Sequence, residues 1–168
     1  MVQQPSLLIK LSQLIPDTTK PIVMLCIGTD RITGDCLGPL VGHLIREQHS
    51  HIPVYGTLEH PVHAKNVEGT LATIQQDYPD ACIIAVDACL SQKEKPGTIV
   101  VQHGPLRPGD GIGRKLPPVG HISIIGVVNT LGTNKLEILK CTRLHTVMDM
   151  AEQISSSIGQ LFCKEKSR

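Results

Sequence analysis

The sequence predicts an α/β fold of three layers, in which helices cover both faces of a mostly parallel sheet of about five strands. Short apolar runs alternate along the chain with segments of helical periodicity, which is typical of parallel strands joined by helices. The 168 residues correspond in size to one ordinary domain. We therefore expect a single domain over residues 1–168, with its core at about 21–162.

The first half of the chain supplies two strands and two helices of this pattern. Residues 21–27 are almost all apolar, which predicts a strand covered on both faces. A helix is expected over 37–49, with Pro39 in its first turn and apolar residues at helical spacing. A second strand is predicted at 53–58, followed by a helix at about 64–76.

The third and fourth strands are predicted at 81–86 and 97–102, where apolar residues again form short runs. Between them and the last part of the chain lies a segment, residues 104–120, that holds five glycines and four prolines. This composition fits neither a strand nor a helix, so we expect a long loop. Loops of this length in compact domains are usually functional or mobile.

The last part of the chain is predicted to hold two helices and one strand. Periodicity alone allows either a helix or a strand over 121–131. We interpret it as a helix, because residues 136–141 form a better final strand. Apolar residues at helical spacing predict a closing helix over 144–162 that packs on the sheet.

Composition excludes several classes of function. Lys and Arg number 16 against 15 acidic residues, with no basic face, and the few aromatic residues offer no platform for stacking bases. No apolar stretch reaches the ~20 residues of a membrane span, and the first residues lack the pattern of a signal peptide. We expect a cytoplasmic protein with neither a nucleic acid nor a membrane as partner.

Two aspartates follow predicted strands at points where they could share one site. Asp35 lies in the loop after the first strand, and Asp87 follows the third. Because the carboxyl ends of parallel strands meet at one sheet edge, the pair predicts a site for acid/base or metal-assisted hydrolysis. Each also has a plainer interpretation: Asp35 could cap the next helix, and Asp87 could be a turn residue.

Further polar and glycine residues follow strands toward the same edge. The glycine-rich loop can bring backbone N–H groups close to a ligand. The sequence lacks the glycine patterns of NAD and ATP sites, so no nucleotide cofactor is expected. The candidate substrate-binding residues are Thr29, Asp30, Glu59, His63, Gly109, Gly111 and Gly113.

Several motifs together resemble the YyaC-type family of sporulation proteins, and the similarity extends over about 21–160. They include Gly34-Asp-Cys-Leu-Gly-Pro, Glu59-His-Pro-Val-His, Ala85-Val-Asp-Ala-Cys-Leu and Pro108-Gly-Asp-Gly-Ile-Gly. The resemblance implies a peptidase-like domain with a phosphorylase/hydrolase-like α/β fold. It also implies a location in the spore or forespore interior of a spore-forming bacterium.

That family is similar to the spore germination protease, whose two functional aspartates match Asp35 and Asp87, and whose glycine loop matches residues 108–113. More distantly, the fold is shared with hydrogenase maturation endopeptidases. Those enzymes place an acidic residue, an aspartate and a histidine around a nickel ion of the substrate. This likeness implies Asp35, Asp87 and His121 as metal ligands.

Three hypotheses follow. The leading one is a sporulation-associated peptidase in which Asp35 and Asp87 share a proton and hydrolyse a peptide bond without a required cofactor. Its substrate would be a protein or peptide, with small acid-soluble spore proteins as candidates. The second is a maturation-type endopeptidase that holds zinc or nickel on Asp35, Asp87 and a third ligand, either His121 or one of His60 and His63. The third is a regulatory sporulation protein that binds peptides without cleaving them.

Overall fold

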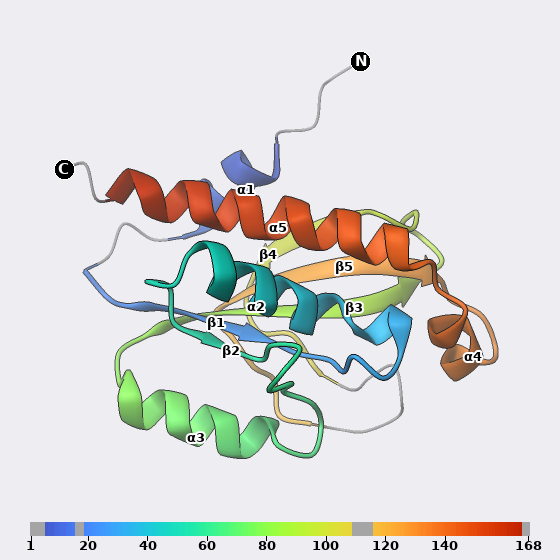
Figure 1. Ribbon diagram of the computed structural model, residues 1–168, viewed down its shortest axis with the longest axis horizontal. Helices are drawn as coiled ribbons and strands as arrows, with labels where there is room; N and C mark the ends of the chain where they lie inside the picture. The colour runs from blue at the N-terminus through green and yellow to red at the C-terminus, as the bar shows by residue number, and fades with distance from the viewer. Residues whose placement is uncertain (1–5, 16–18, 109–115, 166–168) are drawn as a thin grey trace.

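The structure, a computed structural model, describes residues 6–15, 19–108 and 116–165. It contains a five-stranded sheet with the strand order β2-β1-β3-β5-β4 and with helices on both faces (Figure 1). The predicted layered α/β fold is therefore confirmed. The elements, in chain order, are α1 (Leu7–Leu14), β1 (Ile22–Cys26), the short 3-10 helix η1 (Thr33–Asp35), α2 (Leu37–Gln48), β2 (Val54–Tyr55), α3 (Val67–Asp77), β3 (Cys82–Ser91), β4 (Ile99–His103), β5 (Ile122–Thr130), α4 (Lys135–Lys140) and α5 (Leu144–Glu165).

Most of the sheet is parallel. Strand β1 runs parallel to β2 and β3, and β3 runs parallel to β5. Only β4 is antiparallel, where it pairs with β5 at one edge. The pairing of β1 with β3 ends at Cys26 and Val86, although β3 continues to Ser91 beside β5.

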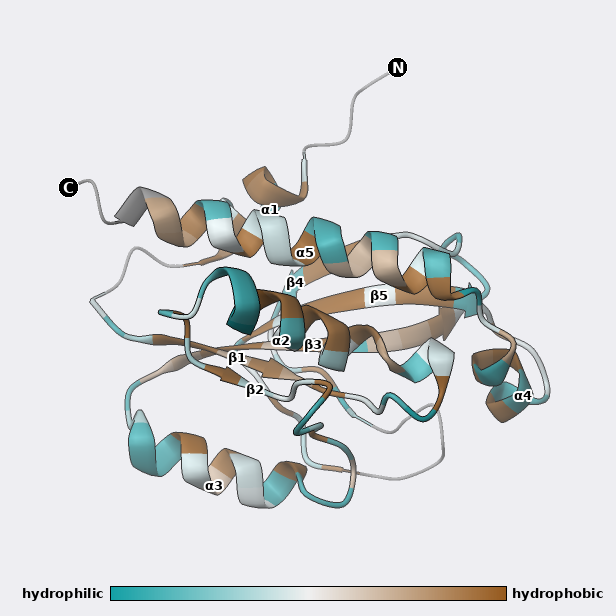
Figure 2. Cartoon of the chain, viewed as in Figure 1, coloured by the Kyte–Doolittle hydropathy of each residue, from teal (hydrophilic) through white to brown (hydrophobic). Residues whose placement is uncertain are grey.

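The core lies on both faces of the sheet. On one face α2 and α5 pack together, with buried Val41 and Ile45 from α2 and Ile154 from α5. On the other face α3 contributes Val67 and Ile74. The apolar, brown stretches of β1 and β5 lie between these layers in Figure 2.

Helix α1 precedes the predicted core at 21–162 and was not expected from the sequence. It packs against α5 and β4, and its Leu11 is fully buried among the core residues of that face. The Ser6 side chain accepts a hydrogen bond from the Ile9 N–H at the start of the helix. No helix among the described residues is long and apolar enough to cross a bilayer.

Two predictions for the last part of the chain are wrong. Residues 121–131 were expected to form a helix, but β5 occupies this segment between β3 and β4. Its nearly continuous apolar sequence suits a strand with neighbours on both sides and helices on both faces. The predicted final strand at 136–141 is instead α4, where the Asn134 side chain accepts a hydrogen bond from the Glu137 N–H.

Other strand boundaries also shift. The predicted second strand at 53–58 is reduced to Val54–Tyr55, because Gly56 adopts a φ of +94° and turns the chain. The predicted third strand at 81–86 is too short. Because β5 offers a partner further along, β3 continues through Asp87 to Ser91.

Candidate active site

The loop after β1 folds back on itself and fixes the position of Asp35. The N–H of Gly28 donates to the Val62 carbonyl at 2.8 Å, and the N–H of Thr29 donates to the Asp35 carbonyl at 3.0 Å. Gly28 adopts a φ of +143°, and a Cβ at this position would collide with the Asp35 carbonyl. The glycine is therefore required by both its backbone conformation and the close approach of η1.

Helix α4 packs against η1. A Cβ at Gly34 would lie 2.8 Å from the backbone carbonyl of Leu139, so these two segments are in direct contact. The N-cap residue of α2 is Cys36, and no side chain makes a capping hydrogen bond there. The interpretation of Asp35 as a helix cap is therefore wrong, and its carboxyl group is left to face the neighbouring pocket.

Asp87 lies inside β3 rather than after it. It pairs with Ile125 of β5, and its Oδ1 accepts a hydrogen bond from the Ala88 N–H at 2.8 Å. The interpretation of Asp87 as a turn residue is therefore wrong. The strand holds its carboxyl group at a fixed position along the sheet.

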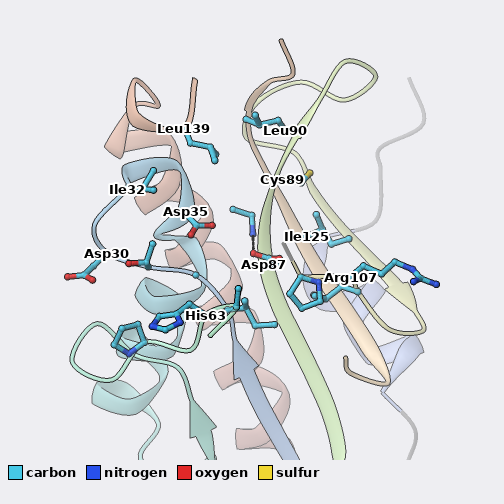
Figure 3. Close-up of a pocket in the computed structure, with 18 of the residues that line it drawn as sticks. Asp30, Ile32, Asp35, His63, Asp87, Cys89, Leu90, Arg107, Ile125 and Leu139 are labelled. Carbon is cyan, nitrogen blue, oxygen red and sulfur yellow. Dashed lines mark hydrogen bonds between the residues drawn. The ribbon is translucent and has the colours of Figure 1, made fainter. Parts of the chain in front are cut away.

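Asp35 and Asp87 both line one pocket of about 1240 Å³ at the carboxyl end of β1 (Figure 3). Burial raises the pKa of Asp35 to about 6, and the Thr29 N–H opposes this increase. Burial also raises the pKa of Asp87 well above its usual value, and the charge of Asp35 raises it further. Because both pKa values are raised, these two carboxyl groups ionise less readily than isolated carboxyl groups.

Two thiols lie next to these carboxyl groups in the sequence. Burial, Asp30 and Asp35 raise the pKa of Cys36 to about 11. Burial and Asp87 raise the pKa of Cys89, which lines the pocket. Since the thiolate is the nucleophilic form, neither cysteine is activated for attack on a substrate.

Four of the predicted substrate-binding residues line this pocket: Thr29, Asp30, Glu59 and His63. Glu59 also forms an ion pair with Arg46 at 3.2 Å, and the His63 Nδ1 accepts a hydrogen bond from the Lys65 N–H. Their predicted role in substrate binding stays a prediction. Gly109, Gly111 and Gly113 lie outside the described residues.

His121 does not lie with the aspartates. Its N–H donates to the Ile83 carbonyl at 2.7 Å, and its Nδ1 accepts a hydrogen bond from the Ile83 N–H at 2.9 Å. Ile125, the β5 residue that pairs with Asp87, comes four residues after His121. Four residues correspond to about 13 Å along a strand. His121 was expected at the carboxyl edge because its segment was predicted as a helix. As a strand, the segment places His121 toward the opposite edge.

The predicted metal site of Asp35, Asp87 and His121 is therefore not assembled. Within residues 6–15, 19–108 and 116–165, no three His, Cys, Asp or Glu side chains group as metal ligands. Among the residues that the structure describes, neither His121 nor His60 or His63 completes a three-ligand set with the two carboxyl groups, so these residues do not fit a resident zinc or nickel ion.

The pocket also contains residues that the sequence analysis missed. Arg107, which follows β4 in the chain, lines one side of the pocket (Figure 3). Ile32 and Leu139 form an apolar wall beside Asp35. Arg107 belongs to residues 104–120, which were predicted to form a long functional or mobile loop. That prediction was an indirect indication that Arg107 could lie at the site. No comparable signal marked Leu139, because its helix was predicted as a strand.

Comparison with known proteins identifies the family. Residues 3–157 match the family described as "Protein of unknown function (DUF1256)". The chain belongs to the DUF1256 family. A member from Bacillus subtilis strain 168, "Uncharacterized protein YyaC", is 44% identical over 141 residues, which cover 83% of this chain and 69% of the relative. The resemblance of this DUF1256 protein to YyaC-type proteins is therefore confirmed.

Solved structures confirm the fold of the DUF1256 protein. The [NiFe] hydrogenase maturation protease HycI from Thermococcus kodakarensis KOD1 gives a TM-score of 0.61 at 17% identity, covering 90% of this chain and 97% of HycI. Peptidyl-tRNA hydrolase from Acinetobacter baumannii gives a TM-score of 0.56 at 10% identity, covering 90% of this chain and 93% of the hydrolase. At these identities the likeness shows a shared fold, and a shared fold does not determine function.

Proposed function

We propose that this protein is a peptidase that hydrolyses a peptide bond with Asp35 and Asp87. The observation that carries the proposal is the position of the two carboxyl groups in one pocket, each with a raised pKa. Perturbed titratable groups in a cleft are typical of catalytic sites. The two aspartates also match the functional pair of the spore germination protease in sequence.

The proposed chemistry uses one proton shared by the two carboxyl groups. The ionised carboxylate accepts a proton from a water molecule as the water oxygen bonds to the peptide carbonyl carbon. The protonated carboxyl donates its proton to the carbonyl oxygen. When the tetrahedral intermediate breaks down, the C–N bond breaks and the leaving nitrogen takes the proton that the first carboxyl received from water. A hydroxyl group of the intermediate gives its proton to the second carboxylate as the carbonyl re-forms. The pair returns to its singly protonated state.

The proposed mechanism requires no resident metal. Its support is the donor set: Asp35 and Asp87 have no third ligand among the described residues. Calorimetric titration with Zn²⁺ or Ni²⁺ should therefore give no saturable binding to the wild-type protein. Binding that disappears in Asp35→Asn and Asp87→Asn would support the metal-dependent alternative instead.

For the substrate, we propose a protein or peptide, with small acid-soluble spore proteins as the first candidates. We place the activity in the cytoplasm, in the spore or forespore interior, as a sporulation or germination step. This part of the proposal is supported by the motifs shared with the spore germination protease, at Asp35, Asp87 and residues 108–113.

The experiment compares the wild type with Asp35→Asn and Asp87→Asn. Each protein is incubated with small acid-soluble spore proteins, and new peptide termini are identified by mass spectrometry. Cleavage by the wild type should fall at least about a thousandfold in both variants, because each loses one partner of the shared proton. Asp149→Asn is the matched control, since Asp149 is an exposed carboxylate on α5 and is not among the residues that line the pocket.

Full cleavage by both Asn variants would contradict the two-aspartate mechanism. If the wild type binds these proteins but produces no new termini, the peptide-binding alternative is favoured. Circular dichroism of all variants establishes whether the fold is retained.

A further inference from the structure

Strand β3 extends beyond the end of its neighbour β1. The last bond between them runs from the Ile27 N–H to the Val86 carbonyl, at 2.8 Å. From there β1 turns away into the loop at Gly28, whereas β3 continues over residues 87–91. We call residues 87–91 the β3 extension. It is paired with β5 on one side and has no neighbouring strand among the described residues on the other.

The direction of the backbone groups follows from the alternation of a strand. The Val86 carbonyl faces β1, so the N–H and C=O groups of Ala88 and Leu90 face the same side. The register of the β3–β5 pair shifts between Cys89 and Leu90, but the extra residue lies in β5. Ser91 still faces β5, as the hydrogen bond from the Leu131 N–H to its carbonyl shows, so the alternation along β3 is kept. The Ala88 N–H is already used by the Asp87 carboxylate.

Three backbone groups of the β3 extension are thus left for another partner: the Ala88 carbonyl and both the N–H and carbonyl of Leu90. None of these three groups takes part in strand pairing or forms a hydrogen bond with another described residue. Ala88 and Leu90 are half-buried and line the same pocket as Asp35 and Asp87. Backbone groups in such a position are costly to leave unpaired, which favours a ligand that completes them.

We propose that the pocket binds its substrate as an extended polypeptide segment that adds a strand beside the β3 extension. The inference rests on the proposed peptidase function and specifies its substrate class: an unstructured stretch of protein chain. Only an extended backbone repeats donors and acceptors at the spacing of Ala88 and Leu90. A helix or a folded surface has its own N–H and C=O groups already engaged.

Strand addition also positions the substrate for the proposed reaction. One substrate residue donates its N–H to the Ala88 carbonyl and accepts from the Leu90 N–H. Because Ala88 directly follows Asp87, this residue lies beside the carboxyl pair. Across the pocket, Ile32 and Leu139 form an apolar wall against which a substrate side chain can pack (Figure 3).

The first arm of the test uses peptides and leaves the protein backbone unchanged. Random twelve-residue peptides displayed on phage are selected on the Asp35→Asn protein, which does not consume them under the proposed mechanism. A selected peptide is then synthesised with single N-methyl groups along its length. Strand addition predicts that affinity falls about tenfold or more at alternate residues of one stretch and changes little at the residues between them.

The second arm changes the protein at one backbone donor. Leu90→Pro removes the Leu90 N–H, whereas Leu90→Ala removes the side chain and keeps it. Cys89, which precedes the new proline, is already in the extended conformation that proline favours. The Pro variant should bind the selected peptide at least about fivefold more weakly than the Ala variant. If Leu90→Pro does not fold, the N-methyl scan alone decides.

Two outcomes overturn the inference: selection that yields no binding peptide, or a peptide whose affinity shows no alternation on N-methylation. Failure of the peptidase proposal looks different. In that case peptides show the alternating pattern, yet the wild type cleaves none of them. If cleavage occurs without the pattern, the peptidase proposal stands and strand addition is wrong.

Discussion

The carboxyl groups of Asp35 and Asp87 belong to separate elements, yet the charge of Asp35 raises the pKa of Asp87. Asp35 is held by the folded-back loop of η1, and Asp87 is fixed inside β3. The sheet therefore keeps two groups together that would repel each other when both are ionised. The free energy of unfolding is therefore lower at pH values where both carboxyl groups would ionise. This effect can be measured without a substrate.

Stability should depend on pH through Asp35. Its pKa is raised from the usual 3.8 to about 6, so the folded state binds its proton more tightly than the unfolded state. The resulting stability is fully present below pH 3.8 and is lost as pH rises through about 6. Asparagine does not ionise, so Asp35→Asn should exceed the wild type in unfolding free energy by about 1–2 kcal/mol at pH 8, after allowance for solvent screening.

Urea denaturation at pH 4, 6 and 8 measures this difference. At pH 4 the two proteins should be nearly equal in unfolding free energy. Asp30→Asn serves as the control, because Asp30 is exposed. A pH-independent difference between wild type and Asp35→Asn would contradict the raised pKa.

Peptide hydrolysis should show a bell-shaped dependence on pH. The rate is highest where the pair of Asp35 and Asp87 carries one proton, and it falls when the pair is doubly protonated or fully ionised. Since both pKa values are raised, the basic limb should lie above the range of an ordinary carboxyl. The profile of kcat/KM against pH measures it, and a profile flat from pH 4 to 9 would argue against carboxyl catalysis.

Replacing Gly28 should destabilise the protein strongly. In Gly28→Ala the new Cβ collides with the Asp35 carbonyl at a φ of +143°, which we expect to cost about 3 kcal/mol and to displace η1. Gly97→Ala is a matched control: Gly97 also has a positive φ, of +93°, but open space around it. Chemical denaturation should show a loss of about 1 kcal/mol there. Equal losses in the two variants would mean that the contact with Asp35 is unimportant.

Leu139 is predicted to support the site from α4. It is buried against Gly34, so Leu139→Ala should lower the free energy of unfolding by about 2–4 kcal/mol through the cavity it leaves. Leu136→Ala removes from the same helix a leucine whose exposed fraction is 43%, and it should change the free energy of unfolding by less than about 1 kcal/mol. Any peptidase activity should decrease in Leu139→Ala alone, because the support of η1 is lost.

The sequence was most informative where local chemistry and topology agree. The apolar run of β1 and the following loop predicted Asp35 at the carboxyl edge, and the parallel strands predicted that Asp87 lies at that edge too. His121 was misplaced for a physical reason: the apolar periodicity of its segment suits a buried helix and a central strand equally. Only the neighbours β3 and β4 decide between them, and their arrangement depends on contacts distant in the sequence.

The extent of β3 could not be predicted for the same reason. Residues 87–91 have no strong strand pattern of their own, and pairing with β5 makes them a strand. The second strand ends at the positive φ of Gly56, where a Cβ would collide with the Cys26 carbonyl. This close approach of two segments distant in the sequence is not visible in the local pattern of residues 53–58.

The protonated thiols of Cys36 and Cys89 have a practical consequence for chemical probing. Thiolates attack peroxides and alkylating reagents much faster than thiols do, so both cysteines should be slow to oxidise or label at neutral pH. Inhibitor classes that depend on a reactive cysteine will therefore miss the pocket. Reagents that esterify carboxyl groups are the ones expected to mark it.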